Sequence, residues 1–307
     1  MPTAIPVRTV RNRKIRLKLT DFCNLDCPFC HSEGAAGAND VDVADPVLRA
    51  ALARLRPHYD QVHLTGGEPT SYRHLGPVVD LLSALDFRIA MTSNGLFNVD
   101  RARVALDACA YLNISLHTLS PAYFESFVKG KGAVAVRVLD LIRRNVRELA
   151  GVLPVRLNTV ISGARDAQQL ASVHAFADEH GLPLKLVPDW RTAVASKRFA
   201  FDYLARNGFE PSEVVRIRPG SNVRRIFAHA DRPPVEVKDI EHFRPDFLCR
   251  GCTVVERCVE SFSFLRVERS PARFRLCVHQ PEVDAEHFFP LFERELLPLL
   301  DAAPEPG

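Results

Sequence analysis

Cysteine is the residue type in this sequence best able to carry chemistry, because seven of its eight copies fall into two tight groups. The first group lies near the N-terminus and comprises Cys23, Cys27 and Cys30. The second lies near the C-terminus and comprises Cys249, Cys252, Cys258 and Cys277. Cys109 stands apart between apolar residues, where a lone thiol is usually a small buried hydrophobe. Cysteines grouped in this way indicate metal binding or redox chemistry more than disulfides.

The first group has the spacing C-x3-C-x2-C and directly follows the strand-like run KIRLKLT. Three thiolates so close in sequence converge on one small inorganic cluster if the loop curls around it. Three thiolates on a four-iron cube leave one iron without a protein ligand, and that iron is free to bind a small molecule. The alternative is a zinc site with His31 as its fourth ligand, although this spacing is unusual for zinc.

This spacing, with Phe29 before the last cysteine, resembles the signature of the radical S-adenosylmethionine (SAM) superfamily. The resemblance implies that Cys23, Cys27 and Cys30 are catalytic and hold a 4Fe-4S cluster whose open iron chelates SAM. Reduction of the cluster would cleave SAM to a 5′-deoxyadenosyl radical, which takes hydrogen from the substrate. The resemblance also implies an electron donor such as flavodoxin or ferredoxin.

A second motif, GGEP, follows the next strand-like run and consists of Gly66, Gly67, Glu68 and Pro69. The two glycines let the backbone approach a ligand, the glutamate can accept from an amine, and the proline fixes the turn. In this position GGEP resembles the family's motif for the methionine part of SAM. Later strand ends supply small polar residues that the resemblance places around the rest of SAM: Thr92, Ser93, Asn94, Ser115 and Asn158. Each of them is also explained by a helix N-cap or a turn.

The rest of the chain alternates strand-like and helix-like segments, which predicts an α/β fold with a parallel sheet. The expected strands are 14–20, 61–67, 88–94, 111–117, 155–161 and 184–190. The expected helices between them are 45–56, 74–85, 99–110, 133–149 and 166–181. We expect a partial (β/α)6 TIM-like barrel with its functional residues at the C-terminal ends of the strands. The predicted divisions are an N-terminal extension (1–13), the barrel (14–190), a connecting and substrate-facing segment (191–248) and a C-terminal cluster domain (249–307).

Several segments, among them RLKLTDFCN and RLNTVISGARD, resemble the GTP 3′,8-cyclase branch of the superfamily, which acts in molybdenum cofactor biosynthesis. That branch holds a second cluster with three cysteines, whereas this chain offers four in the spacing C-x2-C-x5-C-x18-C. The pattern resembles a shortened auxiliary-cluster domain called twitch, and implies a second 4Fe-4S cluster. A zinc ribbon with the same four ligands is the alternative. The chain also has Gln61, His63 and Tyr72 where the cyclases carry basic residues for the triphosphate.

The substrate is expected to be a polar small molecule such as a nucleoside, nucleotide or sugar, used in a specialised biosynthetic pathway. Basic residues are concentrated in the segment 191–248, and arginine forks suit phosphate or carboxylate. The expected substrate contacts are Arg16, at a cyclase position near the substrate, and His117, which could instead cap a turn. The alternatives are a GTP 3′,8-cyclase, a peptide-modifying radical enzyme and a zinc-binding protein without catalysis.

Charge and hydropathy exclude other classes of function. The 40 basic and 37 acidic residues leave a net charge of +3, too small to indicate nucleic acid as the main partner. No apolar run is long enough for a membrane helix or a secretory signal, so a cytoplasmic protein without a membrane partner is expected.

Overall fold

The computed structural model describes residues 4–30, 39–128, 133–258 and 262–302. Its strands form one sheet, and within the described residues they are β1 (Val7–Arg11), β2 (Lys14–Lys18), β3 (Gln61–Thr65), β4 (Arg88–Ser93), β5 (Cys109–Ser115), β6 (Val155–Ile161), β7 (Leu184–Pro188), β8 (Glu210–Arg218), β9 (Asn222–Ala228), β10 (Val235–Ile240), β11 (Leu265–Glu268) and β12 (Arg273–Arg275). The larger helices are α1 (Pro46–Leu55), α2 (Leu75–Ala84), α3 (Val99–Ala108), α5 (Ala133–Ala150), α6 (Ala167–Glu179), α7 (Ala193–Arg206) and α9 (Ala285–Leu291). Shorter ones include α4 (Pro121–Phe124), α8 (Asp246–Cys249) and α10 (Leu297–Asp301).

Strands β2 to β7 are parallel neighbours in sequence order, with helices in the connections between them. The predicted partial (β/α)6 barrel is therefore confirmed, and each of the six expected strands is present. Cys109 and Ala110, which we expected to end a helix, instead begin β5, because Cys109 is in an extended conformation. Cys109 is buried, as the sequence predicted.

The alternation of side chains along each strand explains why this sheet curls with a polar interior. In β2, Ile15 and Leu17 are fully buried, whereas Lys14, Arg16 and Lys18 are half-buried. Because successive side chains point to opposite faces of a strand, the apolar set packs under the helices and the polar set faces the interior of the ring. The same pattern continues in β6, so the barrel has a charged lumen.

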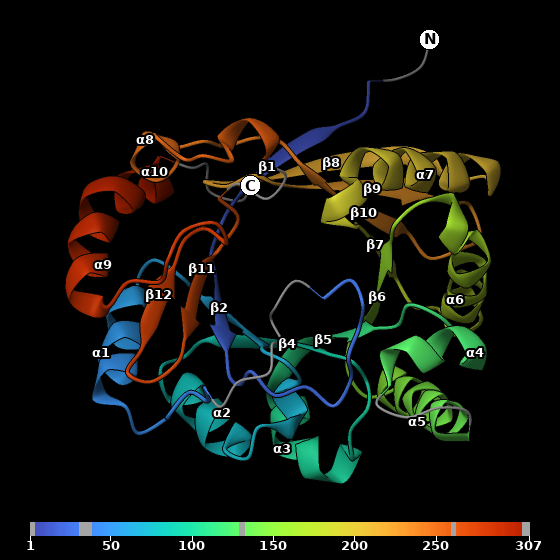
Figure 1. The fold of residues 1–307 in the computed structure, drawn as a ribbon, viewed down its shortest axis with the longest axis horizontal. Helices are drawn as coiled ribbons and strands as arrows, with labels where there is room; N and C mark the ends of the chain where they lie inside the picture. Colours follow the sequence, from blue (N-terminus) through green and yellow to red (C-terminus); the bar gives the residue numbers. More distant parts are fainter. Residues whose placement is uncertain (1–3, 31–38, 129–132, 259–261, 303–307) are drawn as a thin grey trace.

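The sheet continues past the six barrel strands at both ends and closes much of the ring (Figure 1). At one end β10, β9, β8 and β1 extend from β7, and at the other end β11 and β12 extend from β2. The two ends meet where the Asn12 side chain donates to the carbonyls of Pro219 (3.2 Å) and Ser263 (3.1 Å). Residues 7–11 and 210–240, for which we predicted no strands, thus form one wall of the barrel.

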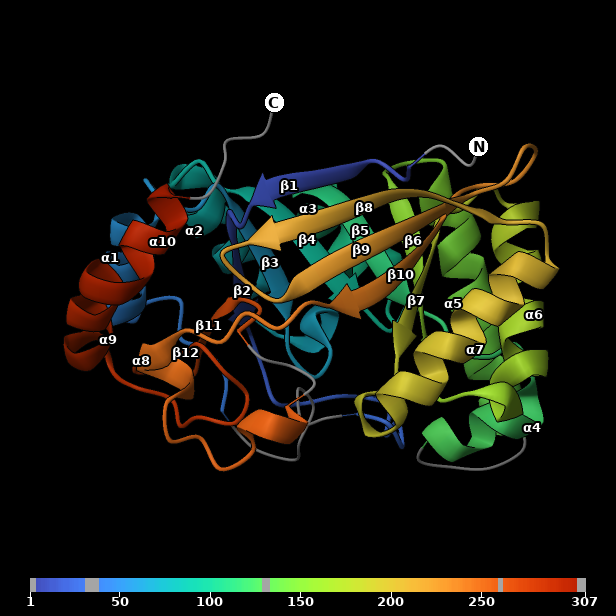
Figure 2. The ribbon, with the colours of Figure 1, turned by 90° about the horizontal axis from the view of Figure 1, so that it is seen from above.

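Helices cover the outside of the barrel. Figure 2 shows α5 and α6 beside β5 to β7, and α7 next to β10. The helix α5 presents Leu139, Ile142, Val146 and Leu149 at helical spacing, and all four are buried. No helix among the described residues combines the length and the apolar character needed to cross a bilayer.

Candidate active site

The first cysteine group lies in a loop that leaves β2 and runs beside the GGEP turn after β3. Gly67 N donates to the Thr20 carbonyl and Glu68 N donates to the Phe22 carbonyl, each at 2.8 Å. Only glycine fits at position 67, because a Cβ there would lie 2.0 Å from the Phe22 carbonyl oxygen. Gly66 has a φ of +151° and a Cβ there would lie 2.6 Å from the Thr20 carbonyl oxygen. The two glycines therefore let the GGEP turn lie directly against the cysteine loop.

Glu68 holds this turn together through its fully buried carboxylate. The carboxylate accepts hydrogen bonds from Thr70 Oγ1 (2.7 Å), Ser93 Oγ (2.8 Å) and the Asn94 backbone N–H (2.7 Å). A buried carboxylate needs such donors, because burial by itself raises the pKa of Glu68. In the structure Glu68 binds the β3 and β4 ends to each other, and its contact with an amine of SAM stays a prediction.

A cavity of about 220 Å³ opens at the C-terminal ends of the strands, where these loops meet. Its walls include most of the residues that the sequence predicted for the first cluster, SAM and the substrate: Cys23, Cys27, Phe29, Cys30, Gly66, Gly67, Thr92, Ser93, Asn94, Ser115 and His117. The remaining predicted residues, Arg16, Glu68, Pro69 and Asn158, do not line it. Pro69 is buried at the start of a short 3-10 turn, and the Asn158 Oδ1 atom is buried without a hydrogen-bond partner.

The three cysteines at this cavity suit a metal cluster better than free thiols. Cys23 and Cys27 are half-buried and Cys30 is exposed. Burial and then the neighbouring Cys23 and Cys30 raise the pKa of Cys27 to about 12. Thiolates crowded at one site need a cation to offset their charge, and iron-sulfur clusters supply it. The described residues contain no three His, Cys, Asp or Glu side chains arranged around a single metal ion, and His31 lies outside those residues.

His117 lies behind the cysteine loop and is neutral. Its Nδ1 accepts a hydrogen bond from the Val160 backbone N–H at 3.0 Å, and its ring stands edge-on to Phe29 with centroids 4.5 Å apart. Burial lowers the pKa of His117 to about 3. Phe29 also contacts the Phe127 ring, at 5.5 Å. The histidine therefore reaches the cavity wall, where its substrate contact stays a prediction, and helps to seat the loop between Cys27 and Cys30.

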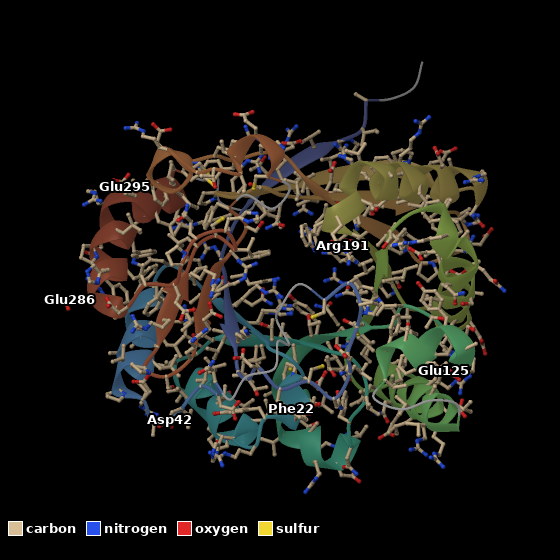
Figure 3. The ribbon with its side chains drawn as sticks, in the orientation of Figure 1. Phe22, Asp42, Glu125, Arg191, Glu286 and Glu295 are labelled. Carbon is tan, nitrogen blue, oxygen red and sulfur yellow. The ribbon has the colours of Figure 1, made fainter. Side chains whose placement is uncertain are left out.

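Sequence reasoning missed several residues of the cavity wall. They come from the ends of β6, β7 and β10 and include Val160, Val187, Asp189, Trp190 and Lys238. Their position at the C-terminal edge of a parallel sheet was the signal that could have identified the first four. Lys238 could not be found in this way, because the strand that carries it was not predicted. Figure 3 shows Arg191 beside the central opening, whereas Glu286 and Glu295 lie on the outer rim.

The lumen below the cavity contains a buried charge cluster, which we call the lumen cluster and define as Lys14, Arg156, Lys185, Arg224 and Glu236. Glu236 pairs with Lys185 (2.5 Å) and Arg156 (3.0 Å), and Arg224 lies 4.0 Å away. Burial opposes ionisation of Glu236, but these three cations lower its pKa to about 2. Burial lowers the pKa of Lys185 to about 8. Three cations thus share one carboxylate, and Lys14 lies within electrostatic range of two of them, Arg156 and Arg224. The Nε atom of Arg224 is buried without an acceptor.

Two further polar residues, Arg16 and His63, lie near the lumen cluster. Arg16 lies on β2 on the same side as Lys14. Burial has the largest effect on the pKa of His63 and lowers it, and the charges of Lys14 and Arg16 lower it further. The His63 Nε2 atom is 2.7 Å from Thr92 Oγ1, and this contact links the lumen to the cavity wall. Many of the other basic residues of the segment 191–248 are paired: Arg216 and Arg218 bind Glu241, and Lys197 and Arg225 bind Asp239.

The second cysteine group gathers near β11 and β12. Burial and then Cys277, Cys258 and Cys252 raise the pKa of Cys249, so the four thiols lie within electrostatic range of one another. Cys252 N donates to the Cys249 carbonyl (3.1 Å) and His279 N donates to Cys277 Sγ (3.4 Å). Because β11 pairs with β2, the strand that leads into the first cysteine loop, the two cysteine groups belong to one continuous sheet framework.

A comparison with protein families identifies the domain that carries the cavity. Residues 17–158 match the Radical SAM superfamily. This chain therefore contains a radical SAM domain. The matched stretch contains the first cysteine group and the GGEP turn, and supports a 4Fe-4S cluster and SAM as cofactors. The comparison does not reach the second cysteine group, so its cluster stays a prediction.

Curated relatives match about half of this chain. A 151-residue stretch is 37% identical to the "Probable GTP 3′,8-cyclase" of Saccharolobus islandicus (strain Y.N.15.51 / Yellowstone #2). The same-named protein of Saccharolobus solfataricus is 36% identical over 151 residues. Each match covers 48% of this chain and 47% of the relative, so the chain aligns with only about half the length of these relatives.

Solved structures show the same fold over most of this chain. Streptococcus suis SuiB bound to S-adenosylmethionine has a TM-score of 0.57 at 16% identity, covering 94% of this chain and 66% of SuiB. SuiB bound to the precursor peptide SuiA has a TM-score of 0.56 at 14% identity, covering 94% of this chain and 64% of SuiB. At this identity the likeness establishes the fold alone.

Proposed function

We propose that this protein is a radical SAM enzyme that takes a hydrogen atom from an anionic small molecule of nucleotide or sugar-phosphate type. The observation that carries the proposal is one cavity that joins three cysteines to the polar ends of β3, β4 and β5. When bound, the cluster supplies one electron that cleaves SAM into methionine and the 5′-deoxyadenosyl radical, and this radical abstracts the hydrogen. A one-electron donor such as flavodoxin or ferredoxin would supply the electron.

Different residues of the chain would hold the cluster, bind SAM and exclude water. Cys23, Cys27 and Cys30 would hold the cluster, and the GGEP turn with Ser93 and Asn94 would seat SAM beside it. Asn94 Nδ2 already donates to Asn24 Oδ1 at 2.6 Å, which ties the end of β4 to the cysteine loop. Phe29, Phe124 and Phe127 form an apolar part of the cavity wall, which helps to exclude water from a reactive radical.

The lumen cluster supports an anionic substrate. Three cations around one carboxylate, with Lys14 nearby, leave an excess of positive charge in a largely buried place. Such an excess is unfavourable until an anion offsets it. Arginine and lysine side chains are the usual partners of phosphate and carboxylate groups. Arg156 Nε donates to Asn113 Oδ1 (3.1 Å), and Asn113 Nδ2 donates to Thr92 Oγ1 (3.2 Å), so the lumen cluster adjoins the Thr92 side of the cavity. A substrate with an anionic end there would present its other end toward SAM.

A GTP 3′,8-cyclase is the second candidate, favoured by the curated relatives of that name. Two positions that carry basic residues in that branch are occupied differently here. Tyr72 is buried and its hydroxyl donates to the Val41 carbonyl, while burial and nearby cations keep His63 neutral. Neither residue offers a positive charge to a triphosphate, and an assay for GTP turnover with SAM decides between the two candidates.

The remaining alternatives have less support. The likeness to SuiB concerns the fold and carries no argument for a peptide substrate. A zinc-binding protein without catalysis is disfavoured by the radical SAM match over residues 17–158. We propose, as the sequence predicted, that Cys249, Cys252, Cys258 and Cys277 hold a second 4Fe-4S cluster. Four thiolates would leave it no open iron for substrate, so it would transfer electrons or order the site.

The metal content of the anaerobically reconstituted protein tests the number of clusters. Two four-iron clusters predict about eight irons and eight sulfides per chain. About four irons with one zinc would keep SAM chemistry in the barrel and make the C-terminal site structural. Zinc without iron would contradict the proposed function.

Thermal unfolding with phosphorylated and unphosphorylated ligands tests the substrate class. Ribose 5-phosphate, GTP and pyrophosphate are the anionic probes, and ribose and guanosine are their uncharged partners. An anion that binds only the folded protein stabilises it by about 2.7 kcal/mol at a hundredfold excess over its Kd. We expect at least one anionic probe to raise Tm and its uncharged partner to have little effect. The substitution Lys185→Met should remove most of this increase.

Lys197→Met is the matched control for the lumen experiment. Lys197 pairs with Asp239, which lies on the opposite face of β10 from Glu236 because side chains alternate along a strand. This variant also removes a lysine that pairs with an acidic residue, but one outside the lumen. The anionic probe should therefore still raise its Tm. If an anionic probe raised the Tm of Lys185→Met and Lys197→Met equally, binding at the lumen cluster would be contradicted. The same would hold if no anionic probe raised the Tm of the wild-type protein.

A further inference from the structure

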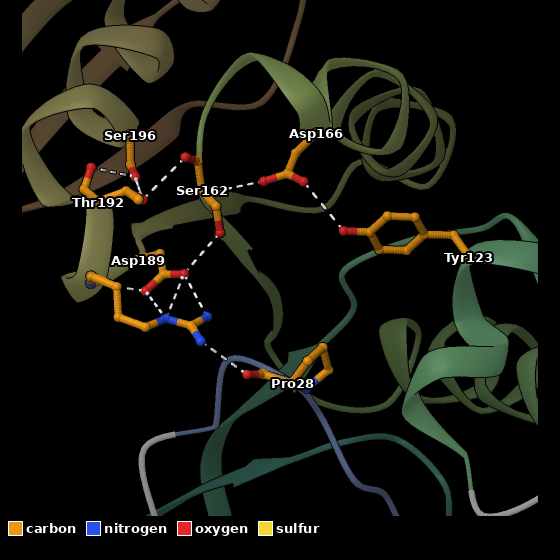
Figure 4. A network of polar contacts seen from close by, with 8 residues as sticks. Pro28, Tyr123, Ser162, Asp166, Asp189, Thr192 and Ser196 are labelled. Carbon is orange, nitrogen blue, oxygen red and sulfur yellow. Dashed lines mark hydrogen bonds and ion pairs between the residues drawn. The ribbon is translucent and has the colours of Figure 1, made fainter.

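An arginine that follows β7 contacts the cysteine loop itself. Arg191 follows β7 and donates from Nη1 to the Pro28 carbonyl at 3.1 Å (Figure 4). Pro28 lies between Cys27 and Cys30, in the turn closed by the hydrogen bond from Cys30 N to the Cys27 carbonyl (3.0 Å). The guanidinium therefore holds the part of the loop that carries two of the three predicted cluster ligands.

Asp189 holds this guanidinium in place. Its carboxylate accepts from Arg191 Nε (3.1 Å) and Nη2 (2.8 Å), and also from the Arg191 backbone N–H (3.0 Å). Ser162 Oγ, at the end of β6, donates to the same carboxylate at 2.8 Å. The Asp189 side chain is 1% exposed, whereas that of Arg191 is 44% exposed. The buried acid therefore orients the arginine, because a bidentate pair fixes the plane of the fork.

The support for Asp189 extends into the barrel wall. Thr192 Oγ1 donates to the Ser162 carbonyl (3.1 Å), and Asp166 accepts from the Ser162 backbone N–H (2.5 Å) and from Tyr123 Oη (3.2 Å). Figure 4 shows these contacts as one connected network from α4 to the loop at Pro28. The first half of the cysteine loop is fixed separately, by the GGEP turn and by Asn94.

The charges of the pair matter as well as its geometry. Burial opposes ionisation of Asp189, but hydrogen bonds from Arg191 and Ser162 lower the pKa of its carboxyl. The carboxylate is therefore negative, and Arg191 neutralises it. Asp189 also lines the cavity that contains Cys23, Cys27 and Cys30. A change in either partner would alter the net charge beside a cluster held there, and nearby charge is one of the factors that set a cluster's reduction potential.

We propose that Asp189 and Arg191 form a positioning pair that fixes the Cys27–Cys30 turn and sets the reduction potential of the cluster held there. Arg191 fixes the turn through the Pro28 carbonyl, and Asp189 orients Arg191 and balances its charge. Neither residue touches the reacting atoms in this role. The inference rests on the proposed function, since it requires a cluster on Cys23, Cys27 and Cys30.

A redox titration of single and double variants tests the pair. The signal is the electron paramagnetic resonance component of the reduced full-length protein that changes when SAM is added, which separates this cluster from any second one. Arg191→Gln leaves a negative charge at the site, so we expect the midpoint potential to fall. Asp189→Asn leaves a positive charge, so we expect it to rise. The double variant restores neutrality and should return toward the wild-type potential.

This pattern separates an electrostatic role from simple loosening of the loop. Loosening would move both single variants in the same direction and would make the double variant the most affected. Arg191→Lys keeps the charge without the fork, so we expect a near-normal potential with weakened cluster retention. The matched control is Arg56→Gln, which removes an arginine that likewise binds an aspartate, Asp86, and backbone carbonyls at the N-terminal edge of the sheet.

The outcomes for the pair and for the proposed function are distinct. If the wild-type protein gives no SAM-responsive iron signal, the proposed function fails and the pair has no cluster to act on. If the wild-type protein gives that signal but the two single variants titrate as the wild type does, or shift in the same direction, the proposed function stands and the positioning pair is overturned.

Discussion

Cys27→Ser is expected to abolish formation of 5′-deoxyadenosine from SAM, down to the background of protein without cluster. Cys27 is the central ligand of the predicted site and lines the cavity with Cys23 and Cys30. A serine oxygen is a poor replacement for a thiolate on iron, so the remaining two thiolates should not retain the cube. The measurement is 5′-deoxyadenosine after reaction with SAM and dithionite, together with iron per chain.

The iron content of the Cys27→Ser variant tests the clusters of both cysteine groups. If each group holds a four-iron cluster, Cys27→Ser should lower iron from about eight to about four per chain. Cys109→Ala is the matched control, because Cys109 is a buried thiol in β5 outside both groups. It should keep both the iron and the activity, with some loss of stability from the removed sulfur. Continued 5′-deoxyadenosine formation by Cys27→Ser would overturn the assignment of the cluster.

The sequence predicted the barrel because its signals were local. The strand β2 alternates apolar and polar residues, and α5 has an apolar face at helical spacing, so each element could be recognised from its own residues. The cysteine loop and the GGEP turn were equally local, since each contains its reactive residues within a few positions. Their meeting in one cavity followed from the rule that the C-terminal ends of parallel strands share one edge.

What the sequence did not reveal depends on contacts between distant segments. The strand β1 pairs with β8, which lies about two hundred residues later, and no local sequence pattern predicts that pairing. The charges of the segment 191–248 were visible, but the acids that neutralise them, such as Asp239 and Glu241, could be assigned only once β10 was placed. The role of Glu68 also needed the structure, because its donors Ser93 and Asn94 come from the next strand of the sheet.

Gly67→Ala is expected to destroy SAM cleavage by pushing the GGEP turn away from the cysteine loop. The new Cβ would lie 2.0 Å from the Phe22 carbonyl oxygen and 2.8 Å from Cys23 N, and both are backbone atoms that cannot rotate away. The hydrogen bonds from Gly67 N and Glu68 N to the loop would have to lengthen or break. Because Cys23 directly follows Phe22, the first cluster ligand should shift with the loop. We expect loss of iron from the barrel site and of 5′-deoxyadenosine formation.

Gly76→Ala is the control that separates this clash from a general effect of alanine. Gly76 lies in α2, where a Cβ would have no heavy atom within 4 Å. Alanine should stabilise that helix by about 0.5–1 kcal/mol, because glycine loses more backbone freedom on folding. We expect Gly76→Ala to keep full activity and a Tm at or above the wild-type value. If Gly67→Ala kept its iron and its SAM cleavage, the close approach of the two loops would not be required for the reaction, and the geometry assigned to the SAM site would be wrong.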